Sequence, residues 1–92
     1  MWIDFLLKSV NRKYIPITYD PHLIIREGHR NLNLDRVEET VRFGKIDYSR
    51  CERPGKICFV RYFGKENMTY TVIAEIKTNF LEVKTSWTKK GR

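Results

Sequence analysis

Four side chains suited to phosphate chemistry fall on one side of a helix predicted to begin at Asp20-Pro21. They are His22, Arg26, His29 and Arg30. With residues advancing by about 100° each, the four lie within a wedge of about 100°, and the aliphatic residues 23–25 centre on the opposite side. Histidine moves a proton near neutral pH, and arginine holds a phosphate through its bidentate fork. The pattern favours a site for phosphodiester chemistry, and a solvated helix face is the alternative interpretation.

A second candidate site lies on the last predicted strand, residues 80–87. Alternation places Leu81, Val83 and Trp87 toward the core, with Thr85 on the same side. The opposite side carries Glu82, Lys84 and Ser86. Lys84 is therefore expected to point outward or toward the edge of a cleft. In the alternative interpretation, Trp87 stacks on a nucleic-acid base at the end of the sheet.

The charge of the chain favours a polyanionic partner. The formal net charge is +7, from 18 Lys and Arg against 11 Asp and Glu, and positive charge concentrates in residues 45–63 and 84–92. Such clusters fit nucleic acid first and an acidic protein second, with a generic basic surface as the alternative.

Individual basic residues in these clusters are candidates for contacts with phosphate groups. Arg61 interrupts an apolar alternation. It is either a charge that keeps an edge strand from pairing with another chain or a ligand for an anion. Arg50 and Arg53 flank the Pro54-Gly55 turn, where solvated loop charges are the simplest interpretation. The tail 88–92 is expected to be mobile and to contact phosphates without fixed geometry. Its basic residues are Lys89, Lys90 and Arg92.

No motif indicates a cofactor or a metal centre. A glycine-rich phosphate loop, a nucleophile elbow and a zinc-protease helix motif are all absent from the sequence. Cys51 and Cys58 are too few for a disulfide framework, and their spacing with His22 and His29 fits no familiar zinc finger. Cys58 is expected to be a small core hydrophobe. With short apolar runs and no visible secretory signal, the expectation is a cytoplasmic protein that needs no cofactor and no membrane.

The predicted elements follow the order β-α-α-β-β-β-β in a single domain, residues 1–92. Residues 2–9, with Trp2, Phe5 and Leu6, form a short helix or an N-terminal arm. Residues 14–19 are β-rich, and a second helix is capped by Asn33 and closed by Gly44. Strands are expected at about 46–50, 56–63, 69–77 and 80–87, with turns at 64–67 and 77–79. The expected fold is α+β, with two helices on one face of an antiparallel sheet of four to five strands.

Several of these segments together resemble a family of short uncharacterised domains. The shared pattern is a histidine, an arginine four residues later, another arginine, a capped second helix ending in glycine, and a strand meander. It is carried by residues 19–26, 29–30, 32–37 and 43–44 and by Val83-Lys84-Thr85. That family is similar to the RelE-like ribonuclease toxins of the barnase, EndoU, colicin and RelE superfamily. The likeness covers about residues 15–88.

The resemblance implies a RelE/barnase-like α+β fold, toxin activity against RNA, and a cognate, acidic antitoxin protein. By position, His22 and Arg26 match the pattern of the first helix and Thr85 matches the terminal strand. Lys84 is added for its charge and placement. Residues 1–14 have no counterpart in the family, and residues 89–92 form a basic tail beyond the matched core.

The favoured hypothesis is a metal-independent endoribonuclease, in which the ribose 2′-hydroxyl attacks its own phosphate. A histidine or another base would assist the attack, and arginine or lysine would stabilise the developing charge. RNA, free or on the ribosome, would be its substrate. One alternative is a non-catalytic nucleic-acid-binding module with a basic face. The other is an interaction domain whose basic face meets an acidic partner.

Overall fold

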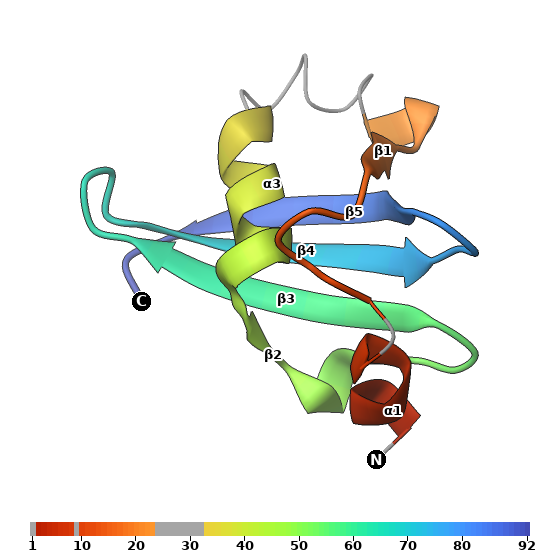
Figure 1. Ribbon diagram of the computed structural model, residues 1–92. Coiled ribbons are helices and arrows are strands. Elements are labelled where there is room, and N and C mark those ends of the chain that lie inside the picture. The colour runs from red at the N-terminus through yellow and green to blue at the C-terminus, as the bar shows by residue number, and fades with distance from the viewer. Residues whose placement is uncertain (1, 9, 24–32) are drawn as a thin grey trace.

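The computed structural model describes residues 2–8, 10–23 and 33–92 (Figure 1). Its centre is a five-stranded sheet with the order β1-β5-β4-β3-β2. The strands are β1 (Ile17–Tyr19), β2 (Lys45–Ile46), β3 (Lys56–Phe63), β4 (Met68–Ile76) and β5 (Leu81–Lys90). The helices are α1 (Trp2–Lys8), α3 (Leu34–Phe43) and the 3-10 helix η1 (Tyr48–Arg50), and residues 21–23 are also helical. The expected α+β class is confirmed.

The sheet is mixed, so the expectation of a wholly antiparallel sheet is wrong. Strands β2 to β5 pair antiparallel in sequence order, but β1 runs parallel to β5, with Ile17 opposite Leu81. Strands joined by a tight turn must run antiparallel. Because β1 and β5 are far apart in the sequence, no turn fixes their relative direction.

Local capping determines where α3 begins and ends. The Asn33 side chain accepts hydrogen bonds from the backbone N–H groups of Asp35 (2.9 Å) and Arg36 (3.4 Å), which confirms the predicted cap. At the other end, a Cβ on Gly44 would lie 2.4 Å from the carbonyl oxygen of Thr40 and 2.9 Å from that of Val60. Only glycine therefore allows α3 to end against β3. The start predicted at Asp20-Pro21 is also confirmed, and the rest of that helix lies outside the described residues.

The main core lies between α3 and the sheet. In Figure 1, α3 crosses one face of the sheet, and residues 10–16 run over the same side. Fully buried positions come from α3, β3, β4 and β5 and include Val37, Val41, Ile57, Phe59, Val72, Leu81 and Val83. From α1, Ile3 joins this cluster, whereas Phe5 is 78% exposed. Residues 2–8 are thus a helix rather than an extended arm, but its buried side is centred on Ile3 rather than on Phe5.

Two arginines attach the segment 10–16 to the C-terminal end of α3. The Arg12 guanidinium donates to the carbonyl oxygens of Val41 (3.1 Å) and Gly44 (3.0 Å). Arg42 donates in return to the carbonyls of Arg12 and Ile15, both at 2.9 Å. Arg12 also lies over the Phe59 ring, 5.1 Å from its centroid. Burial lowers the pKa of Arg12, as expected for a partly desolvated cation.

A β-bulge in β5 overturns the predicted alternation. Opposite β4, Ile73 pairs with Thr85 and Ala74 pairs with Val83, which leaves Lys84 as the extra residue. One inserted residue reverses the faces of all that follow. Ser86 is therefore buried and donates to the carbonyl of Thr71 at 3.1 Å, while Trp87, on the other face, is only partly buried. The placement of Trp87 in the core and of Ser86 outside it is wrong.

Two other predicted boundaries change. The strand expected at 46–50 ends at Ile46, because the Asp47 carboxylate accepts from the backbone N–H (3.2 Å) and hydroxyl (2.7 Å) of Ser49 and so caps η1. The expected mobile tail belongs largely to β5, which extends to Lys90. Beyond it, the backbone N–H of Gly91 donates to the carbonyl of Asn67 at 2.8 Å. The C-terminal charges are therefore held against the β3–β4 turn.

Candidate functional site

The structure brings two of the predicted catalytic residues together on a carboxylate that was predicted only as a helix cap. Asp20 Oδ1 lies 2.9 Å from His22 Nδ1, and Asp20 Oδ2 lies 3.0 Å from Lys84 Nζ. His22 belongs to the helical residues 21–23, and Lys84 belongs to β5. We call these three residues the Asp20 cluster.

Backbone pairing explains why these residues meet. Asp20 follows β1 directly, and its backbone N–H donates to the carbonyl of Val83 at 2.9 Å. The parallel β1–β5 pairing is thus extended to Asp20, beside the bulge at Lys84. Lys84 is the bulged residue, and its ammonium group contacts the carboxylate of Asp20, although the two residues are far apart in the sequence. The cluster therefore depends on the strand order and on the irregularity of β5.

Hydrogen bonding keeps Asp20 ionised. The backbone N–H of His22, the Lys84 ammonium and the His22 ring hold the pKa of Asp20 well below its usual range. The same contact with Asp20 raises the pKa of Lys84. An ionised carboxylate only accepts hydrogen bonds, so His22 Nδ1 must carry a proton in this contact. In a neutral imidazole the lone pair is then on Nε2, which is the nitrogen able to accept a proton.

The Asp20 cluster is open to solvent on the side of His22. The His22 side chain is 87% exposed, whereas that of Asp20 is 16% exposed. Lys84 also lies 3.4 Å from Glu82, and Lys77 pairs with Glu75 at 2.8 Å on the neighbouring strand end. The contact with Lys77 lowers the pKa of Glu75. The cluster thus combines an oriented, accessible imidazole with a fixed ammonium group.

The remaining predicted catalytic residues are placed less informatively. Thr85 follows Lys84 in β5, is partly buried and pairs with Ile73. Arg26 lies outside the described residues. His29 and Arg30, which were predicted to bind nucleic acid, also lie outside them. In the Asp20 cluster, sequence reasoning missed Asp20 as a partner of the histidine. Its spacing of two residues from His22 was visible, but its contact with Lys84 was not.

The predicted phosphate-binding residues lie apart from the Asp20 cluster. Arg50 pairs with Asp47 at 3.4 Å and lies over the Trp87 ring, and Arg53 lies over the Trp2 ring. Arg61 and Arg92 line a hollow of about 740 Å³ at the opposite edge of the sheet, where β2 pairs with β3. Lys89 and Lys90 are exposed at the end of β5.

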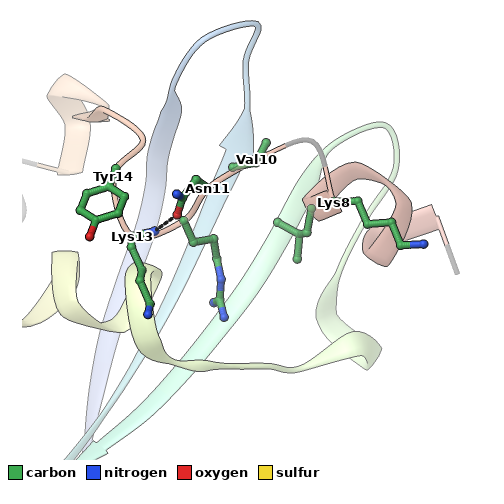
Figure 2. A pocket seen from close by; sticks show the side chains of 7 residues that line it. Lys8, Val10, Asn11, Lys13 and Tyr14 are labelled. Carbon is green, nitrogen blue, oxygen red and sulfur yellow. Dashed lines mark hydrogen bonds between the residues drawn. The ribbon is translucent and has the colours of Figure 1, made fainter.

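A second hollow of about 750 Å³ lies along residues 7–8 and 10–14, and Figure 2 shows its lining side chains. Lys8 and Lys13 are exposed there, and the backbone N–H of Lys13 donates to Asn11 Oδ1 at 3.2 Å. The third cation of this lining, Arg12, is occupied by the carbonyls at the end of α3. Among the residues that the structure describes, neither lysine forms an ion pair with a carboxylate.

The described residues contain no cluster of three or more His, Cys, Asp or Glu that could hold a metal ion.

Both cysteines are free thiols, and Cys58 is fully buried, which confirms its expected place in the core. Burial raises the pKa of the Cys58 thiol to about 11. In the same described part of the chain, no helix is long and apolar enough to cross a membrane.

Comparison of the chain with protein-family models, with curated proteins and with solved structures found no match.

Proposed function

We propose that this protein is a metal-independent endoribonuclease whose reactive centre is the Asp20 cluster. The observation that carries the proposal is a single carboxylate, that of Asp20, which contacts both the His22 ring and the Lys84 ammonium. An oriented imidazole can act as a general base, and a nearby cation can stabilise the charge that develops on the phosphate, so the two groups suit cleavage of a phosphodiester without a metal. The net charge of +7 supports a polyanionic substrate.

In the proposed reaction, His22 Nε2 takes the proton of a ribose 2′-hydroxyl, whose oxygen then attacks the adjacent phosphorus. The bond from phosphorus to the 5′-oxygen breaks, and that oxygen takes a proton from solvent. The products are a 2′,3′-cyclic phosphate and a free 5′-hydroxyl. Asp20 is a positioning residue that stabilises the imidazolium, and Lys84 stabilises the negative charge that develops on the phosphate oxygens.

The resemblance to RelE-like ribonuclease toxins supports the same activity and extends it to a biological role. In that role the chain is the toxin of a pair, and an acidic antitoxin protein covers its basic surface. Arg26 and Thr85 are further candidates for contacts with the substrate. RNA presented on the ribosome is a second form of the substrate to test.

The test is incubation of the purified, EDTA-treated protein with an end-labelled RNA, alone and with ribosomes. We expect cleavage that leaves 2′,3′-cyclic phosphate ends, and a loss of about 10²- to 10⁴-fold in rate for His22→Ala. Because the His22 side chain is 87% exposed, its removal should leave thermal unfolding unchanged. Lys13→Ala is the control for an exposed side chain outside the site.

Equal cleavage by His22→Ala and wild type would show that the site is elsewhere. A complete lack of cleavage, with and without ribosomes, would refute the proposed endoribonuclease activity. RNA retained at low salt in that case would favour the second candidate function, a non-catalytic nucleic-acid-binding module. The cations at the β2–β3 edge of the sheet specifically support that candidate.

A further inference from the structure

The hollow at the β2–β3 edge collects positive charge that no described acidic side chain neutralises. Lys45, Arg61 and Arg92 line it. Within the described residues, none of the three forms an ion pair with a carboxylate, whereas Arg36, Arg42, Lys77 and Lys84 all do. The one acid in the lining, Asp47, already accepts from Ser49 and pairs with Arg50. The hollow therefore carries a local excess of cations.

Aromatic rings hold two of these cations in place. The Arg61 guanidinium contacts two rings, at 5.7 Å from the centroid of Phe43 and 5.4 Å from that of Phe63. The Arg92 guanidinium lies 4.5 Å from the centroid of Tyr62. A cation–π contact with a ring face helps to orient a guanidinium and leaves its N–H donors able to bind an anion.

Backbone contacts fix the position of Arg92 as well. Gly91 adopts a φ of 79°, and its N–H donates to the carbonyl of Asn67 at 2.8 Å. The hydroxyl of Thr69 donates to the carbonyl of Gly91, and the Tyr62 hydroxyl lies 2.7 Å from Asn67 Oδ1. The last residues of the chain are thus attached to the β3–β4 turn, so Arg92 is presented at a defined place.

The short β2 strand leaves this part of β3 uncovered. β2 pairs only Lys45 with Val60 and Ile46 with Phe59, so the edge of β3 from Arg61 onward has no partner in that strand. Phe43, the last residue of α3, is 53% exposed beside it. A flat apolar ring next to fixed guanidinium groups suits a ligand that has both a planar base and a phosphate.

We infer that this hollow binds a nucleotide segment of single-stranded RNA, with its phosphates on Lys45, Arg61 and Arg92 and a base against Phe43. The inference deepens the proposed function, on which the choice of RNA rests. β1 and β2 are the opposite edges of the sheet, about 19 Å apart for strands spaced by about 4.8 Å. The hollow therefore binds a part of the RNA that is remote from the nucleotide at the Asp20 cluster.

The experiment measures binding without cleavage. A fluorescein-labelled 2′-O-methyl RNA of about ten nucleotides has no free 2′-hydroxyl, so its fluorescence anisotropy reports affinity whether or not the protein is an enzyme. The site variant is Arg61→Gln/Arg92→Gln. The control is Lys8→Gln/Lys13→Gln, which removes the same charge from the other hollow (Figure 2). Arg92→Gln alone serves as the variant with the smallest effect on folding, and unlabelled poly-glutamate is the competitor.

For the site variant we expect about tenfold weaker binding or more, and a log–log salt slope reduced by about 0.7 for each lost phosphate contact. The control should keep the slope of the wild type. Equal losses in both double variants, or no binding by the wild type, would overturn the inference. So would competition by poly-glutamate as effective as that by unlabelled RNA, since the hollow would then recognise any polyanion. Because the probe cannot be cleaved, none of these results depends on the Asp20 cluster.

Discussion

Replacing Arg12 by alanine should destabilise the fold without touching either proposed RNA contact. The substitution removes two hydrogen bonds, from the guanidinium to the carbonyls of Val41 and Gly44. These carbonyls belong to the end of α3, where the helix itself provides no donors. It also removes a cation lying 5.1 Å from the centroid of the Phe59 ring.

The magnitude follows from these contacts. Hydrogen bonds to a charged donor contribute about 1.5–3 kcal/mol each when buried, and about 1 kcal/mol each is reasonable where water can replace part of the contact. The contact with the ring adds about 0.5–1 kcal/mol. We expect the free energy of unfolding to fall by about 2–3 kcal/mol, which corresponds to a lower melting temperature by about 10 °C or more in a domain of this size.

The assay is urea unfolding followed by far-UV circular dichroism, with two comparison variants. Arg12→Lys keeps the charge but reaches one carbonyl at best, so it should lose about half as much. Lys13→Ala removes a neighbouring exposed side chain and should change the free energy by less than about 0.5 kcal/mol. If Arg12→Ala is as stable as Lys13→Ala, then the guanidinium does not hold the segment 10–16 on α3.

Two further predictions concern the helix cap and the buried thiol. Asn33→Ala should lower the free energy of unfolding by about 1 kcal/mol, because two backbone donors of α3 lose their acceptor, and Asn33→Asp should preserve it; urea unfolding compares the two. Cys58 should resist iodoacetamide at pH 8 in the folded protein and react once urea is added, as mass spectrometry of the peptides would show. Folding raises the pKa of the Cys58 thiol to about 11. The stability that Cys58 contributes is therefore complete below the unfolded pKa of about 8.5, and it is lost as the pH rises toward 11. Cys58→Ala should remove that part of the pH dependence, and an unchanged profile would contradict the assignment.

Short-range sequence signals correctly predicted the elements that contacts between near neighbours stabilise. The Asn33 cap, the Asp20 cap and the strand at 56–63 all appear where the sequence placed them. Each depends on hydrogen bonds between near neighbours or on the alternation of one continuous strand. The order and number of strands in the meander followed from turn-forming residues for the same reason.

The faces of β5 could not be predicted in this way. Alternation holds only while each residue has one partner, and the unpaired Lys84 reverses it from Thr85 onward. That single irregularity decided both that Trp87 leaves the core and that Ser86 enters it. Nothing in the residues 80–87 alone marks the bulge, because it is a property of the pairing with β4.

The sequence by itself determined the charge of this protein, the caps of its helices and the residue types available for phosphate chemistry, since these depend on composition and on contacts within a few residues. Only the tertiary structure decided which of those residues meet. Asp20 and Lys84 come together because β1 pairs parallel with β5 at the bulge. Arg61, from β3, and Arg92, from beyond β5, both line the hollow at the β2–β3 edge. These contacts join segments distant in the chain, and their geometry is determined by the packing of the sheet rather than by the spacing of the residues.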